Sequence, residues 1–304
     1  MSSTEHQQQR VILVTGANKG IGFEVVKKLV QRSSSGNNDV ILLGSRDLQR
    51  GQDALKQLGS PPNTHILELD TSSKESIARA TNEIKQKYGG RLDILINNAG
   101  MARPVETPES ARETVNTNYY GVKLLNEHLI PLLRDNGRII NVASEVASIT
   151  FYFVSKDLQD QFTSPTLTTE QLDGLVEDFV SAVQSKALEK LGYPSKLPSW
   201  AYSVSKAALI ALTRIEAGRQ PEGKKIFVYS VTPGYCCTNL SNHASDARPA
   251  EAGADSILHA VDTPANELEN GAFYQDGIKL PPICQDGAKV QEYVVRWQKR
   301  AASQ

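Results

Sequence analysis

The feature that most constrains the fold of this chain is an alternation of short β-branched runs with longer amphipathic stretches. The β-branched runs are apolar at nearly every position, which suits strands of a parallel sheet that is buried on both faces. A strand, a helix and a further parallel strand form a right-handed βαβ unit. The sequence therefore predicts an α/β fold, a doubly wound parallel sheet of about seven strands.

The expected elements follow this alternation closely. The predicted strands are residues 11–14, 40–43, 65–69, 92–96, 138–142 and 226–231, with 271–274 as a short last strand. The predicted helices are residues 21–31, 47–58, 73–88, 111–133 and 202–216. Ser72, with Glu75 three positions later, predicts a capping box at the start of the third helix.

One interval departs from the alternation, because no strand is expected between Ser144 and Tyr202. Residues 169–191 repeat apolar side chains at helical spacing, so we expect residues 145–200 to be a helical insertion rather than a second domain. We therefore predict a single domain over residues 1–304, with a flexible N-terminus at 1–10 and a C-terminal extension at 281–304 that contains an amphipathic helix.

Composition excludes several classes of function. A net charge of −1 argues against a nucleic-acid or acidic-membrane partner. The three cysteines form neither a disulfide framework nor a metal-ligand pattern. The first ten residues lack the apolar core of a signal peptide, and no run of about 18 apolar residues predicts a membrane span. We expect a cytoplasmic protein without a metal, acting on a small molecule.

A glycine-rich turn, with the spacing Gly-x-x-x-Gly-x-Gly, lies between the first strand and the first helix. Such a turn lets the backbone approach a pyrophosphate at the helix N-terminus. The alternative is a turn of the same shape that binds no ligand. The cofactor contacts predicted here are Gly16, Asn18, Lys19, Gly20, Ile21 and Gly22.

The end of the second strand indicates which dinucleotide binds. An acidic residue there would bind the ribose hydroxyls of NAD, but this strand is followed by Arg46. Arg46 and Lys19 together favour the 2′-phosphate of NADP, unless Arg46 is only a solvated loop charge. The neighbouring Asp47 is suited to cap the next helix.

Two further strand ends supply candidate cofactor contacts. Asp70, followed by Thr71, is placed to accept a hydrogen bond from the adenine amine, or else to cap the loop that follows it. Asn98, Ala99 and Gly100 bring polar groups and a small residue to the ribose side, or else form an ordinary turn.

Tyr202 and Lys206 lie four positions apart at the start of an apolar helical run, so both side chains leave the same helix face. A fixed ammonium makes the phenol easier to deprotonate, because it stabilises the phenolate. Such a group can exchange a proton with a substrate oxygen near neutral pH. The pair also occurs by chance, so its meaning depends on the rest of the chain.

The chain resembles the short-chain dehydrogenase/reductase family in five motifs that follow one another in the same order. They are the glycine turn, the Asn-Asn-Ala-Gly segment, Ser144, Tyr202-x-x-x-Lys206 and Pro233-Gly234. The resemblance spans residue 11 to about 275. Within this family, the chain is most similar to the NADPH-dependent carbonyl reductases. The similar parts are the insertion and segments 16–22, 46–47, 50–52, 87–90 and 117–121. It implies a Rossmann-type fold and NADPH/NADP as cofactor. It also implies a monomer, because the insertion blocks the usual helix-face dimerisation.

The resemblance also implies residue roles. Tyr202 would protonate the carbonyl oxygen, while Lys206 would lower the pKa of Tyr202 and bind the nicotinamide ribose. Ser144 would hold the substrate oxygen, unless it is only a strand-end cap. Asn118 would anchor a water that links Lys206 to solvent, unless it is an ordinary buried amide.

Further implied contacts follow the sixth strand. Pro233, Gly234 and Thr238 would contact the nicotinamide, with Thr238 bonding its carboxamide. Tyr235 stands where a larger aromatic residue commonly closes the substrate pocket. Trp200 is expected to pack in the core, and Cys236 and Cys237 to be buried thiols rather than reactive ones.

Glu145 is a departure from the carbonyl reductases, in which apolar residues are more usual at this place. Its carboxylate either favours a cationic or hydroxylated substrate or points to solvent. The predicted substrate contacts are Ser144, Glu145, Tyr202 and Tyr235.

The function predicted from these residues is NADPH-dependent reduction of a ketone, aldehyde or quinone to an alcohol. One alternative is a biosynthetic NADP-dependent alcohol dehydrogenase for one metabolite. Another is a non-catalytic dinucleotide-binding sensor or scaffold. Its expected sign, the loss of the tyrosine, the lysine or the serine, is absent here.

Overall fold

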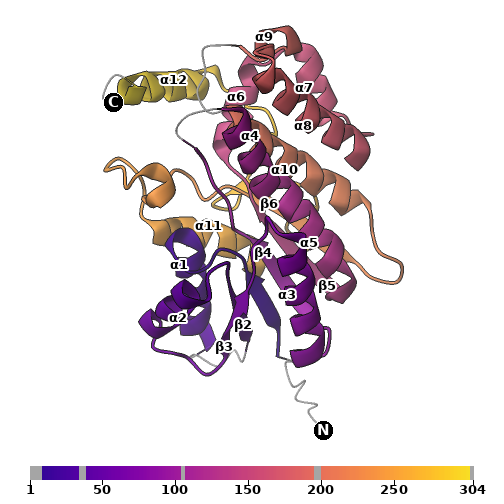
Figure 1. Cartoon of the computed structure of the whole chain (residues 1–304), viewed down its shortest axis with the longest axis vertical. Coiled ribbons are helices and arrows are strands. Elements are labelled where there is room, and N and C mark those ends of the chain that lie inside the picture. Colours follow the sequence, from indigo (N-terminus) through magenta and orange to yellow (C-terminus); the bar gives the residue numbers. More distant parts are fainter. Residues whose placement is uncertain (1–8, 34–38, 104–106, 195–199, 302–304) are drawn as a thin grey trace.

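The computed structural model describes residues 9–33, 39–103, 107–194 and 200–301. At its centre lies one eight-stranded sheet in the order β3-β2-β1-β4-β5-β6-β7-β8, with helices on both faces (Figure 1). Neighbouring strands are parallel except β7 and β8, which pair antiparallel. The predicted doubly wound α/β fold is confirmed.

The elements have the following bounds. The strands are β1 (Val11–Val14), β2 (Val40–Ser45), β3 (Thr64–Glu68), β4 (Leu92–Asn97), β5 (Leu133–Val142), β6 (Ile226–Val231), β7 (Phe273–Gln275) and β8 (Ile278–Leu280). The helices of the first half are α1 (Gly20–Ser33), α2 (Leu48–Gln57), α3 (Lys74–Lys87), α4 (Pro108–Val115), the π-helical turn η1 (Asn116–Tyr120) and α5 (Gly121–Leu129). The remaining α-helices are α6 (Glu145–Thr150), α7 (Lys156–Thr163), α8 (Thr169–Gln184), α9 (Leu188–Leu191), α10 (Trp200–Gly218), α11 (Ala250–Asp262) and α12 (Gly287–Ala301).

The strand predicted at residues 271–274 is present as β7, but the prediction that it is the last strand is wrong, because β8 follows β7 in a hairpin. The two strands are joined by Asp276 and Gly277, both with positive φ (49° and 81°). Asp-Gly is the residue pair that favours such two-residue turns, so the sequence held this signal. Helix α11 was also not predicted.

The predicted helix 111–133 is divided into α4, the π-helical turn η1, α5 and a short 3₁₀ turn (Ile130–Leu132). Strand β5 begins at Leu133, five residues before its predicted start, because the polar residues 134–136 obscured its apolar pattern. The predicted cap Ser72 is also wrong. Its hydroxyl donates to Asp70, and Ser73 caps α3 by accepting from the N–H of Ser76.

The core consists of layers on the two faces of the sheet. Ile12 and Val14 of β1 pack in one cluster with side chains of α1 and α11. Val11 and Leu13 point to the opposite face, where they pack with side chains of α3 and α5. Each such side chain contributes about 1.5–3 kcal/mol when buried, which explains why the strand is apolar at every position.

The insertion before Tyr202 is helical, as predicted, and consists of α6 to α9. Helix α8 buries Leu172, Val176 and Phe179 in one cluster with side chains of α4 and α10. Trp200 packs against Tyr193 with a ring-centroid distance of 5.2 Å. It is therefore a core residue, as expected.

The C-terminal extension forms the predicted helix, α12, which contacts α6. Most of the predicted flexible N-terminus, residues 1–8, lies outside the described residues. Within the part of the chain that the structure describes, no helix combines the length and apolarity needed to cross a bilayer.

Candidate active site

The predicted site residues gather at the edge of the sheet where the parallel strands end. The glycine turn follows β1, Asn98 follows β4, Ser144 follows β5 and Pro233 follows β6. Chain order reverses between β1 and β4, because β2 and β3 lie on one side of β1 and the later strands on the other. Such a switch point is where open α/β sheets bind their ligands.

The glycine turn and the Asn98–Ala99 segment form one hydrogen-bonded unit. The Asn98 side chain donates to the carbonyls of Thr15 (2.9 Å) and Gly16 (3.2 Å), and the Ala99 N–H donates to the Thr15 hydroxyl (2.9 Å). A Cβ at Gly16 would lie 2.9 Å from the Ala99 Cα, and one at Gly22 would lie 2.4 Å from the Asn98 amide nitrogen. Packing inside the protein therefore requires glycine at both positions.

Gly20 differs from these two glycines because little protein surrounds it. It has φ +58°, and the nearest atom to a Cβ there is the Thr238 methyl at 3.5 Å. Helix α1 begins at Gly20 and carries no acidic side chain in its first turn, so its N-terminus suits an anion. The fold thus places Gly20 opposite the loop that carries Thr238, whose hydroxyl caps a short 3₁₀ turn (Asn239–Ser241).

Arg46 lies beyond the end of β2, exposed and without a hydrogen-bond or ion-pair partner among the described residues. Asp47 caps α2, as expected, by accepting from the N–H of Arg50 (2.9 Å). Asp70 accepts from the N–H and the hydroxyl of Ser72 (2.9 and 2.6 Å), so its carboxylate caps the loop in this structure. Arg46 is therefore a cation available to an incoming phosphate.

Tyr202, Lys206 and Ser144 meet where α10 crosses the ends of the strands. The Lys206 ammonium lies 5.9 Å from the centroid of the Tyr202 ring and donates to the Val142 carbonyl (2.7 Å). Burial raises the pKa of Tyr202, and its hydrogen bond with Ser144 acts in the opposite direction. Burial lowers the pKa of Lys206 to about 8. At neutral pH the phenol therefore holds its proton beside a charged ammonium.

Asn118 lies in η1, fully buried. Its oxygen accepts from the N–H of Met101 (2.9 Å), and its amide donates to the Met101 carbonyl (2.8 Å) and the Ser205 hydroxyl (3.0 Å). A Cβ at Gly100 would lie 3.3 Å from the Asn118 oxygen and 3.4 Å from the Lys206 nitrogen. The structure thus brings together Gly100, Asn118 and Lys206, which are far apart in sequence.

Glu145 has a partner that sequence reasoning missed. Its carboxylate forms an ion pair with Lys289 of α12, and its N–H donates to the Thr232 hydroxyl (3.2 Å). Neither predicted role of the carboxylate included such a pair. No spacing signal links two residues so far apart in the chain.

The loop after β6 carries Tyr235, half-buried, and the two neighbouring cysteines. Cys236 is buried and donates to the Pro233 carbonyl, and burial raises the pKa of its thiol to about 11. This thiol is therefore protonated and inert at neutral pH. The expectation of a buried thiol is wrong for Cys237, which is half-buried, with its sulfur 4.0 Å from the His243 ring nitrogen.

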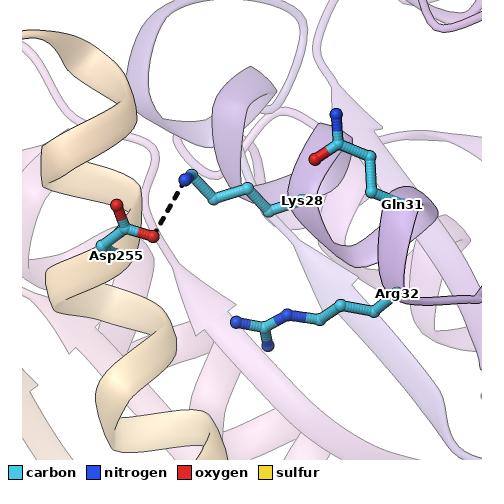
Figure 2. A pocket seen from close by; sticks show the side chains of 4 residues that line it. All are labelled: Lys28, Gln31, Arg32 and Asp255. Carbon is cyan, nitrogen blue, oxygen red and sulfur yellow. Dashed lines mark ion pairs between the residues drawn. The ribbon is translucent and has the colours of Figure 1, made fainter. Parts of the chain in front are cut away.

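A hollow of 330 Å³ between α1 and α11 contains none of these residues (Figure 2). Lys28, Gln31, Arg32 and Asp255 line it. Lys28 pairs with Asp255 (2.9 Å), and Arg32 pairs with Asp262 (2.6 Å). Both cations are used to join the two helices, so the hollow is not the candidate site.

A glycine turn at the switch point of a doubly wound sheet, with a tyrosine, a lysine and a serine at neighbouring strand ends, defines a dinucleotide-dependent oxidoreductase. The family model described as short chain dehydrogenase matches residues 10–163. The chain belongs to this family.

Similar proteins share most of their length with this chain. A carbonyl reductase (NADPH) 1 of Homo sapiens is 35% identical over 286 residues, which cover 91% of this chain and 98% of that protein. Among solved structures, salutaridine reductase from Papaver somniferum is 31% identical, with a TM-score of 0.77 over 88% of this chain and 99% of that one. Menthone neomenthol reductase from Mentha piperita is 30% identical, with a TM-score of 0.72 over 88% and 98% of the two chains.

Proposed function

We propose that this protein reduces the carbonyl group of a small molecule to an alcohol, with NADPH as its cofactor. The observation that carries the proposal is the contact of Tyr202 with Ser144, beside the buried ammonium of Lys206. Its similarity to a carbonyl reductase that is named for NADPH supports both the reaction and the cofactor.

The residues present fit NADPH. The open backbone at Gly20 and the N-terminus of α1 suit the pyrophosphate. Arg46, which has no partner among the residues that the structure describes, and the exposed Lys19 suit the 2′-phosphate. Thr238 faces Gly20 and would contact the nicotinamide end together with Pro233 and Gly234. We also propose that Asp70 and Thr71 contact the adenine side of the cofactor. Further proposed cofactor contacts are Asn18, Ile21 and Asn98–Gly100.

Bound NADPH supplies the hydride, and the protein supplies the proton. The Ser144 hydroxyl would donate a hydrogen bond to the substrate oxygen, which holds the carbonyl beside Tyr202. Tyr202 would then give its proton to that oxygen. The charge of Lys206 would stabilise the phenolate that remains.

A screen of NADPH and NADH, each against ketones, aldehydes and quinones, tests this function. We expect oxidation of NADPH with at least one carbonyl class, and clearly slower oxidation of NADH. Failure to reduce any carbonyl while NADPH binds tightly would favour a non-catalytic dinucleotide sensor.

A second candidate is a biosynthetic reductase for one metabolite. The observation that favours it is the likeness to two structures named for particular compounds, with TM-scores of 0.77 and 0.72. The same screen separates the two functions, because a biosynthetic enzyme prefers one substrate by orders of magnitude whereas a general reductase accepts many.

We also propose that the protein is a cytoplasmic monomer. Helix α8 packs against α4 and α10, so the insertion covers a helix face that is otherwise suited to self-association. Sedimentation of the purified protein is expected to give the mass of one chain, 33.2 kDa. A dimer mass would contradict this proposal and leave the reaction unaffected.

A further inference from the structure

Helix α8 of the insertion is bonded to the residue that follows Asn118. The hydroxyl of Tyr119, which is fully buried, donates to one carboxylate oxygen of Asp173 (2.8 Å). The other oxygen of Asp173 pairs with Lys123 (2.5 Å), which lies in α5, four residues after Tyr119. A single carboxylate of the insertion therefore holds two residues that flank the start of α5.

A second carboxylate of α8 repeats this pattern. Glu177, four residues after Asp173, accepts from the hydroxyl of Tyr120 (2.8 Å) and pairs with both terminal nitrogens of the Arg112 guanidinium (2.6 and 2.7 Å). Residues four apart share one helix face, so α8 presents both carboxylates to the same segment.

The segment that they hold is the π-helical turn η1, which contains Asn118, Tyr119 and Tyr120. A π-helical turn is less favourable than an α-helical one, and it persists where surrounding contacts maintain it. The apolar side chains Leu172, Val176 and Phe179 already fix α8 to the core. A helix that served only as a cover would not need two tyrosine hydroxyls, one of a buried and one of a half-buried side chain, bonded to its carboxylates.

From η1 the contacts continue to the catalytic helix. The Asn118 amide donates to the hydroxyl of Ser205 (3.0 Å), which in turn donates to the carbonyl of Tyr202 (2.8 Å). Ser205 is fully buried and precedes Lys206 directly. The other bonds of Asn118 fix the backbone of Met101, next to Gly100.

We propose that Asp173, acting through Tyr119, is a positioning residue of the active site. It holds η1 so that Asn118 bridges the Met101 backbone and Ser205 beside Tyr202 and Lys206. The insertion is thus part of the catalytic scaffold as well as a cover. The effect on turnover rests on the proposed reductase function, whereas the geometric effect does not.

The test uses Tyr119→Phe and Asp173→Ala in the full chain, separately and together. We expect each variant to lower kcat about tenfold with NADPH affinity changed less than about twofold, because positioning errors act on turnover. The N–H of Met101 should exchange with deuterium about tenfold faster, because its acceptor is no longer held. Since Asp173→Ala already removes the contact with Tyr119 as well as the ion pair with Lys123, the double variant should lose no more than Asp173→Ala alone.

Arg219→Ala is the matched control. Its guanidinium donates to the Thr169 hydroxyl (2.9 Å), so it also joins α8 to the end of α10, but far along the helix from Ser205. We expect lower thermal stability and unchanged kcat and Met101 exchange. If Arg219→Ala accelerated Met101 exchange as much as Tyr119→Phe, or if Tyr119→Phe and Asp173→Ala left it unchanged, the proposal would be overturned. The exchange measurement decides this even if no carbonyl substrate is found.

Discussion

The proposed cofactor side and the proposed substrate side of the active-site edge are held by different kinds of contact. On the cofactor side, the ends of the neighbouring strands β1 and β4 bond to each other through Thr15 and Asn98. On the substrate side, helix α6, which begins beside Ser144, is held by the far end of the chain. The Ser148 hydroxyl donates to the Pro281 carbonyl, 133 positions away.

This difference teaches how the two sides depend on the rest of the protein. Contacts between adjacent parallel strands follow directly from the βαβ order of the chain. Contacts with α8 and α12 depend on where the insertion and the C-terminal extension pack. We therefore expect substitutions on the cofactor side to change NADPH affinity, and those on the substrate side to change carbonyl selectivity.

The largest effect is expected at Tyr202, where the two sides meet. Tyr202→Phe should lower kcat about 10²–10⁴-fold, because it removes the proposed proton donor, while the dissociation constant of NADPH stays within about twofold. Steady-state kinetics and fluorescence titration measure the two quantities. The exposed Tyr152 provides the control, since Tyr152→Phe should change neither. Near-normal turnover of Tyr202→Phe would assign the proton to another group.

A smaller effect, confined to the cofactor side, is expected at Arg46. Arg46→Ala should weaken NADPH binding about 10–100-fold, because a charge-assisted hydrogen bond contributes about 1.5–3 kcal/mol. NADH, which lacks the 2′-phosphate, should lose little. Lys56→Ala removes an exposed cation from the other end of α2 and should leave both affinities unchanged. Equal losses for the two cofactors would contradict the 2′-phosphate contact.

On the substrate side, Lys289→Ala should raise KM for a neutral ketone about fivefold and leave NADPH affinity unchanged, because the Glu145 carboxylate beside Ser144 then lacks its counter-charge. A ketone that carries an ammonium group should lose less. Lys279→Ala breaks an ion pair with Glu269 elsewhere in the C-terminal region and serves as the control. A rise in the dissociation constant of NADPH would show that the two sides are not separate.

The smallest effect concerns the half-buried Glu216 near the end of α10, which accepts a hydrogen bond from Asn126 (2.8 Å). Burial raises the pKa of Glu216 from 4.5 to about 8. The contribution of protonated Glu216 to the free energy of unfolding is therefore fully present below pH 4.5 and is lost as the pH rises through about 8. Glu216→Gln, which is always neutral, should melt about 2–4 °C above the wild type at pH 9 and together with it at pH 4. A pH-independent difference in scanning calorimetry would contradict the raised pKa, and the exposed Glu222→Gln should show no difference.

The sequence predicted much of this molecule where the signal was local. Strands β1 and β6 have their predicted bounds, and the cap Asp47 acts as expected. The errors arose where a contact that the residue pattern does not reveal changed the local structure. Asp70 engages Ser72, which moves the cap of α3 to Ser73, and η1 interrupts a helix that periodicity alone predicts as continuous.

By itself the sequence determined the doubly wound fold, the glycine turn and the spacing of Tyr202 and Lys206. Each depends on residues within one or two helical turns or one strand, so periodicity and residue type are sufficient. Only the tertiary structure decided that Lys289 neutralises Glu145, that Thr238 faces Gly20 and that Asp173 holds Tyr119. These pairs join segments that no repeat or spacing relates, and packing of the whole chain creates them.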